Sequence, residues 1–253
     1  MAFLVEDGTG IASANSYGDI PDAQTYFGDR GRLAEWNGTD TSTTITAADA
    51  GADTLTAAAH PFETGDGPVT FTGSDLPDGL ALLTEYWLVV SDASTLQVAT
   101  TYALAVAAVP TVIDLVDVGS GTMTIVHPDF DDQRAAFVKA TDYVELLYSA
   151  RYRGVRSTAA QGLEWPRSVA YDKLGDLMTL VPAALLYAVC EYAIRARSAS
   201  LLADDTDASA SAKNRSVAGV SYSTSYSGAK KVSYPAADRL MRTVTRKALT
   251  QRA

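Results

Sequence analysis

The chain has 253 residues, of which 47% are hydrophobic and 20% are charged, and its formal net charge is −10. This length allows one large domain or two small ones, and the hydrophobic content allows a packed core. The apolar runs are too short to cross a bilayer, the first residues lack the pattern of a signal peptide, and the single cysteine excludes an internal disulfide.

The charges are divided unevenly along the chain. No Lys or Arg occurs between Arg32 and Arg134, whereas residues 41–128 carry ten acidic residues. Residues 213–253 carry nine basic residues and one acidic residue, which gives 9 − 1 = +8. This split predicts two parts with different surroundings. The acidic part would be repelled by nucleic acid, while the basic end suits phosphate or an acidic protein surface.

The first 40 residues predict an extended arm followed by a helix that starts near Pro21. From about residue 41 the composition changes to Thr, Ala, Val, Gly and Asp, with frequent turn signals. A small antiparallel barrel or sandwich is predicted there, with a short helix over residues 102–109. Its strands are expected at residues 43–47, 54–57, 68–72, 85–90, 95–100, 111–115 and 122–126.

A long helix is predicted from about residue 131, with apolar residues at helical spacing at Phe137, Ala140, Val144 and Leu147. Gly154 ends this pattern. The following segment, residues 163–167, reads LEWPR. A large aromatic residue held in a turn usually fills a core, so we expect Trp165 to be a core anchor.

The remaining chain predicts two more helices. One extends from Pro182 to about residue 197, and the other begins at Pro235 and continues through Leu249. Between them, residues 201–214 are polar and low in complexity, which predicts a loop. Residues 217–226 alternate and predict a strand or hairpin.

The sequence contains no recognisable catalytic constellation. His60 and His127 each precede a proline at the edge of the β-rich part, and no metal-ligand spacing or phosphate-binding loop occurs. Cys190 lies in an apolar helical run, which favours a buried thiol. We therefore expect no enzyme activity, no cofactor and no metal.

Two features suggest binding. The first is a group of arginines near Tyr148 and Tyr152, namely Arg151, Arg153, Arg156 and Arg167. Such a group would suit a contact between subunits or with single-stranded nucleic acid. It could equally be a solvated face with internal ion pairs. The second is the basic C-terminal helix, expected to dock on a portal or a neighbouring subunit unless it packs on its own core: Arg239, Leu240, Arg242, Val244, Arg246, Lys247 and Leu249.

Residues 139–167, with ATDY, YSARYRG and LEWPR, resemble a tailed-phage family described as DnaT-like single-stranded DNA-binding, which is similar to head-to-tail adaptor proteins. The resemblance extends to residues 14–32, 181–196 and 234–241. It implies a helical adaptor core of about four helices and a short β-hairpin. The core family does not require the β-rich part, which we therefore expect to be an inserted all-β barrel or sandwich domain, so that the whole chain has an α+β fold. The expected parts are residues 1–40 and 129–253 for the core and 41–128 for the insert.

The resemblance also implies a function. The expected protein is a structural component of the virion, made in the host cytoplasm and located in the neck. It would form a ring of identical subunits, dodecameric by resemblance, between the portal and a lower neck or tail-completion protein, with DNA nearby in the lumen and no membrane partner. The alternative is a single-stranded DNA-binding replication protein. A cell-wall hydrolase is a third class, which the empty search for catalytic residues disfavours.

Overall fold

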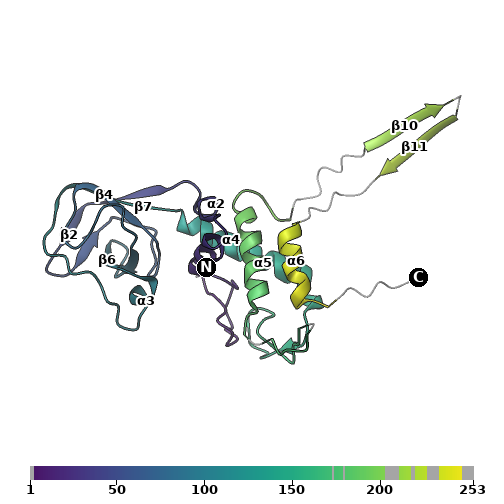
Figure 1. Cartoon of the computed structure of the whole chain (residues 1–253), viewed down its shortest axis with the longest axis horizontal. Coiled ribbons are helices and arrows are strands. Elements are labelled where there is room, and N and C mark those ends of the chain that lie inside the picture. Colours follow the sequence, from purple (N-terminus) through teal and green to yellow (C-terminus); the bar gives the residue numbers. More distant parts are fainter. Residues whose placement is uncertain are drawn as a thin grey trace.

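The computed structural model describes residues 3–172, 174–178, 180–202, 211–217, 220–226 and 234–246. It contains both helices and antiparallel sheets, so the predicted α+β class is confirmed. Two large hydrophobic cores are present, one among the helices and one among the strands of the segment from Thr41 to His127 (Figure 1). The first four residues of β1 are mostly exposed where the chain passes from one part to the other.

Three helices form the centre of the helical part, and α5 packs against both of the others (Figure 1): α4 (Phe130–Tyr148), α5 (Ala183–Ala196) and α6 (Pro235–Val244). Asp129 caps α4 by accepting a hydrogen bond from the backbone N–H of Asp132, which offsets one unpaired donor of the first turn. The apolar stripe predicted from the spacing is buried at Phe137, Ala140 and Val144.

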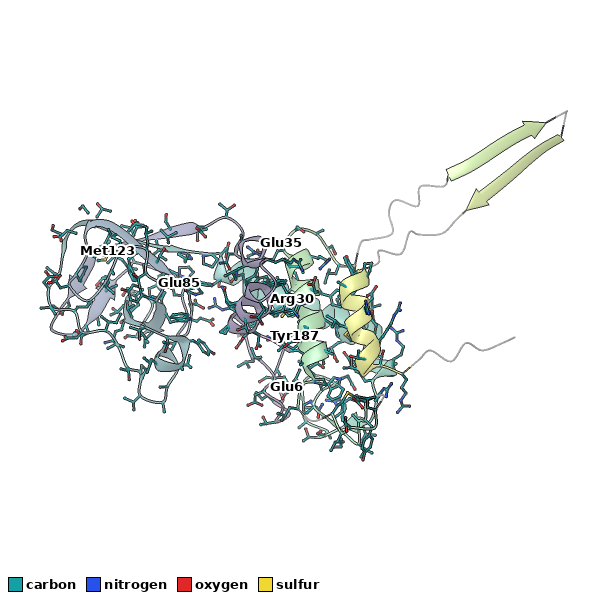
Figure 2. The ribbon with its side chains drawn as sticks, viewed as in Figure 1. Glu6, Arg30, Glu35, Glu85, Met123 and Tyr187 are labelled. Carbon is teal, nitrogen blue, oxygen red and sulfur yellow. The ribbon has the colours of Figure 1, made fainter. Side chains whose placement is uncertain are left out.

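Two short helices, α1 (Ile20–Gly28) and α2 (Leu33–Asn37), cover the other side of this bundle. The guanidinium of Arg30 lies 3.7 Å from the ring centroid of Tyr26 and 5.4 Å from that of Tyr187 (Figure 2). In the arm before α1, the buried carboxylate of Glu6 accepts hydrogen bonds from the backbone N–H groups of Gly8, Gly10 and Ile11. The arm is therefore a folded turn rather than a free extension.

The β-rich part consists of two antiparallel sheets. One has the strand order β1 (Thr41–Ile45), β7 (Ser120–His127) and β4 (Thr70–Asp75). The other has the order β2 (Ala47–Asp49), β3 (Thr54–Thr56), β6 (Thr95–Ala99) and β5 (Trp87–Val90). Alternate strand residues point inward, as on a half-buried pleated surface, and form a core that includes Leu55, Phe71, Leu88, Leu96 and Ile125.

Two sequence predictions in this part were wrong. The predicted strand at residues 111–115 is not one. The N–H of Ile113 does donate to the carbonyl of Val98 in β6, but the N–H of Leu115 donates to the Asp53 side chain instead, so no ladder continues along β6. The predicted helix at residues 102–109 is only α3 (Tyr102–Ala105), and Val106 already has a non-helical backbone at its C-cap.

Three smaller elements follow α4: a 3-10 turn, η1 (Ser149–Arg151), and a two-residue pair of strands, β8 (Val155–Arg156) and β9 (Arg167–Ser168). Gly154 has φ = +72°, and a Cβ at this position would collide with the carbonyl oxygen of Ser168. A glycine is therefore required where the chain leaves α4 and forms the small ladder.

Near the C-terminus, β10 (Ser211–Val217) and β11 (Val220–Tyr226) form a separate antiparallel hairpin. The predicted loop at residues 201–214 was therefore too long, because residues 211–214 belong to β10. The last helix is shorter than predicted. It ends at Val244 because Thr245 is extended and forms a bridge with Tyr152, and Leu249 lies outside the described residues.

Candidate functional site

The LEWPR turn is fixed to the helical core by buried polar contacts. Trp165 is fully buried, and its backbone N–H donates to the hydroxyl of Tyr17 over 3.0 Å. That hydroxyl donates to Glu145 of α4 over 2.7 Å, and Glu145 also accepts from the N–H of Glu164 over 3.2 Å. The ring of Tyr152 packs edge-on against Trp165, with centroids 6.1 Å apart. Burial raises the pKa of the Glu145 carboxyl. The buried indole and these hydrogen bonds together fix the LEWPR turn to the helical core.

Two of the four candidate arginines bond main-chain carbonyls close to the turn, and Arg167 is the more buried of the two, since Arg156 is exposed. Arg167 donates to the main-chain carbonyls of Arg153 and Gly154 and pairs with Glu164, and only 10% of its side chain is exposed. Arg156 donates to the carbonyl of Gln161. Bonds to carbonyls at the ends of short strands satisfy backbone acceptors that would otherwise lack donors. Arg167 in particular is part of the turn's own structure.

Of the other two arginines, Arg153 is half-buried and Arg151 is exposed. Arg153 donates to the carbonyls of Tyr171, over 2.9 Å, and Thr245, over 3.4 Å. Arg151 donates to the carbonyl of Leu147, and its guanidinium lies 4.6 Å from the ring centroid of Tyr148. The structure thus brings the four arginines to one region around the turn, where each makes at least one contact within the chain.

Helix α6 is tied to the bundle by Asp238. Its carboxylate accepts hydrogen bonds from the hydroxyls of Tyr192, over 2.6 Å, and Tyr148, over 3.0 Å, and from the backbone N–H of Tyr234, over 3.2 Å. Hydrogen bonds to an ionised acceptor are stronger than those between neutral groups. Asp238 therefore joins α4, α5 and α6, which the sequence did not indicate.

We expect Asp238→Ala to destabilise the fold by about 1–3 kcal/mol, because it leaves two tyrosine hydroxyls without their acceptor. Hydrogen exchange of the α6 amides should accelerate more than that of the α4 amides. Arg239→Ala, which removes an exposed side chain of the same helix, is the matched control and should change neither quantity. Equal exchange rates in the two variants would contradict the proposed anchoring.

Some of the C-terminal residues predicted to dock on a partner are buried in this chain, and others are exposed. Val244 is buried in this chain's own core, Leu240 is half-buried against it, and Arg239, Arg242 and Arg246 are exposed. Lys247 and Leu249 lie outside the described residues. The apolar side of α6 therefore contributes to this chain's own core, and its exposed basic side remains a predicted contact surface.

A buried ion pair joins the β-rich part to α4. Arg134 pairs with Asp66, whose side chain is 5% exposed, and its other nitrogens lie 3.3 Å from Glu63 and 3.1 Å from Asp131. Burial raises the pKa of Asp66 to about 6, against the lowering effect of Arg134. The sequence hinted at this residue only weakly, since Arg134 is the first base after a long stretch without any.

Two carboxylates share the start of α1, beside this joint. Asp19 accepts from the N–H of Asp22 over 2.9 Å, and Asp22 accepts from the N–H of Asp19 over 3.1 Å. Burial, followed by the charge of Asp22, raises the pKa of Asp19 to about 7. The folded pKa lies above the unfolded value of about 4, so this group makes the protein less stable as pH rises from about 4 to 7.

Asp19→Asn should therefore stabilise the protein at pH 8 by about 1–3 kcal/mol, because the amide oxygen retains the cap while the charge is lost. At pH 4.5 the two proteins should be nearly equal in stability. Denaturant unfolding at both pH values checks this. A variant that is less stable at pH 8 would refute the assigned shift.

Among the described residues, no group of three or more His, Cys, Asp or Glu side chains is placed to hold a metal ion. Burial raises the pKa of the Cys190 thiol well above its usual value and lowers the pKa of His127. Of the helices described, none is long and apolar enough to span a bilayer.

An exposed apolar segment lies between β9 and α5. Its large apolar side chains are between 48% and 87% exposed within a run of twelve positions: Val169, Tyr171, Leu174, Leu177 and Leu180. Val169 and Leu180 also have positive φ values of 54° and 55°, which are rare for residues with a Cβ branch or a large side chain. The sequence did not indicate this exposed apolar surface.

A groove of about 790 Å³ lies at the other end of α5, lined by apolar and charged side chains that include Tyr143, Leu146, Leu202, Lys139 and Asp142. Exposed apolar surface of this kind is typical of contacts with other proteins. The groove and the exposed segment lie at opposite ends of one helix.

Comparison with known families gives a match to the C-terminal two thirds of the chain. A family described as "Putative DnaT-like ssDNA binding protein" matches residues 86–253. The match begins inside the β-rich part, and residues 1–85 are not included in it. No curated protein and no solved structure matches the chain.

Proposed function

The chain belongs to this putative DnaT-like ssDNA-binding family, whose match covers most of its length, and we propose that it is a structural protein of a tailed-phage particle. In this proposal it is a head-to-tail adaptor that forms a ring of identical subunits in the neck. The portal lies on one side of the ring and a lower neck or tail protein on the other.

The observation that carries the proposal is the group of exposed apolar side chains between Val169 and Leu180, on a helical body that has a hydrophobic core of its own. Clusters of exposed leucine, valine and tyrosine indicate protein contacts, because nucleic acid would select exposed cations. An adaptor needs such contact surfaces and needs no catalytic group.

The candidate residues for stacking and charge also favour this proposal. Tyr152 is buried, and the hydroxyl of Tyr148 is bonded to Asp238. Arg167 is bonded to carbonyls of its own chain. A surface for single-stranded DNA needs exposed aromatic rings beside exposed cations. Tyr152 and Arg167 thus contribute to the fold, whereas Arg151, which is exposed beside the half-buried Tyr148, could contact either kind of partner.

Quantitative mass spectrometry of purified particles tests the proposal. We expect the protein in every particle, at a fixed ratio to the portal subunit that fits a closed ring. Absence from purified particles, or a copy number that varies between preparations, would contradict an adaptor role.

Single-stranded DNA binding is the second candidate function, and the family description favours it. It predicts that the purified protein binds a fluorescent oligonucleotide with an affinity that falls steeply as salt is raised. Anisotropy titrations at several salt concentrations decide the point. Binding that is absent at low salt would remove this candidate.

A further inference from the structure

The β10–β11 hairpin is a sheet of two strands. Its register runs without interruption from Ser211↔Tyr226 to Val217↔Val220. No other described strand joins this sheet, so both of its outer edges are unpaired in the described part of the chain. Figure 1 shows the two strands extending away from α5 and α6.

Such a hairpin is marginally stable by itself in water, because two strands bury little apolar surface. Each outer edge also presents a row of N–H and C=O groups that can pair with another strand. The sequence of the hairpin contains no proline and no acidic residue that would oppose such pairing. A partner strand on each edge would therefore stabilise it.

The distribution of charge identifies which strand fits each edge. Both basic residues of the hairpin, Lys213 and Arg215, lie on β10, whereas β11 has no charged residue and carries Tyr222, Thr224 and Tyr226. The register places Lys213 opposite Thr224 and Arg215 opposite Tyr222. Pairing β10 with β10 of a second copy would bring basic rows together, and like charges on adjacent strands are destabilising.

We propose that hairpins of neighbouring copies pair edge to edge, with β11 of one copy against β10 of the next. Each contact between copies then pairs one β10 with one β11, as within each hairpin, and all neighbouring strands remain antiparallel. The contact is head-to-tail, so it closes into a ring when the rotation between copies allows, and closure leaves no free edge. The inference deepens the proposed adaptor function and rests on it for the ring.

The backbone pattern gives a selective test. In an antiparallel ladder, pairs that exchange hydrogen bonds alternate with pairs that do not. In a hairpin whose strands are joined by two residues, the pair that flanks the connection exchanges hydrogen bonds, and here that pair is Val217↔Val220. Asn214↔Ser223 lies three pairs further along the ladder, so it is a pair that does not exchange hydrogen bonds. The N–H of Ser223 then faces the outer edge. Ser223→Pro removes this donor and leaves the hairpin's own hydrogen bonds in place.

The experiment is native mass spectrometry of the full-length protein between 1 and about 200 µM, with Ser223→Ala as the matched control. We expect wild type and Ser223→Ala to form the same closed ring. Ser223→Pro should raise the concentration for half-assembly at least tenfold, with unchanged helical circular dichroism. A second variant, with residues 211–226 replaced by a short Gly/Ser linker, should behave like Ser223→Pro.

Each outcome decides between the claims. Rings of normal stability in both altered proteins would overturn the edge pairing and leave the adaptor proposal intact. A wild-type protein that stays monomeric up to the highest concentration would overturn hairpin-driven assembly. The adaptor role would still be tested separately, by mass spectrometry of purified particles. If the Ser223→Pro and linker variants form normal rings and Lys213→Ala with Arg215→Ala abolishes oligonucleotide binding, the hairpin serves nucleic acid instead of edge pairing.

Discussion

Trp165→Ala should lower the free energy of unfolding by roughly 3–5 kcal/mol, the range for a large aromatic side chain truncated in a packed interior. The indole is fully buried and packs against Tyr152. Its backbone N–H also donates to the hydroxyl of Tyr17, which in turn bonds Glu145. This backbone bond remains in the variant, so the expected loss comes from the buried indole and its contact with Tyr152.

Denaturant unfolding followed by circular dichroism measures this effect. Trp165→Phe, which retains an aromatic ring, should lose clearly less stability than Trp165→Ala. Trp87, which is only half-buried in β5, offers a second comparison, because Trp87→Ala should lose less than Trp165→Ala. A loss below about 1 kcal/mol for Trp165→Ala would show that the LEWPR turn is not an anchor.

Arg134→Ala should cost about 3–5 kcal/mol at pH 7.5, because it leaves the buried carboxylate of Asp66 without its cation. The pH dependence distinguishes this cause from lost packing. The pKa of Asp66 is about 6 with Arg134 present, and it should rise further without it. At pH 5 the carboxyl of the variant is therefore protonated, and the loss of stability should be smaller.

Two controls sharpen this prediction. Asp131→Ala removes an exposed partner of Arg134 and should change stability by less than about 1 kcal/mol. The double variant Arg134→Leu and Asp66→Leu removes both charges and should be more stable than Arg134→Ala. An Arg134→Ala loss that is the same at pH 5 and pH 7.5 would contradict a role for the buried charge.

The elements that could be predicted from the sequence are those with strong local patterns. The spacing of Phe137, Ala140 and Val144 identified α4, and the position of Trp165 in its turn indicated burial. The end of α6 could not be predicted, because residues up to Leu249 continue the apolar spacing. The helix stops at Val244 since Thr245 pairs with Tyr152, a contact between distant parts of the chain.

The candidate site was harder to predict for the same reason. The cluster of arginines was visible in the sequence, but the carbonyls that Arg167 bonds depend on how β8 and β9 pair. Asp66 and Arg134 are 68 positions apart, and no spacing rule relates them. Asp238 was one acid in a basic segment, and its role depends on the hydroxyls of Tyr148 and Tyr192.

Cryo-electron microscopy of the neck in purified particles tests the central claim most directly. The adaptor proposal predicts a closed ring directly below the portal, with each subunit fitted by the α4–α5–α6 bundle and the β-rich part. The edge-pairing proposal adds a continuous band of β10–β11 hairpins around that ring. A neck whose density below the portal is fully explained by other proteins would contradict the account.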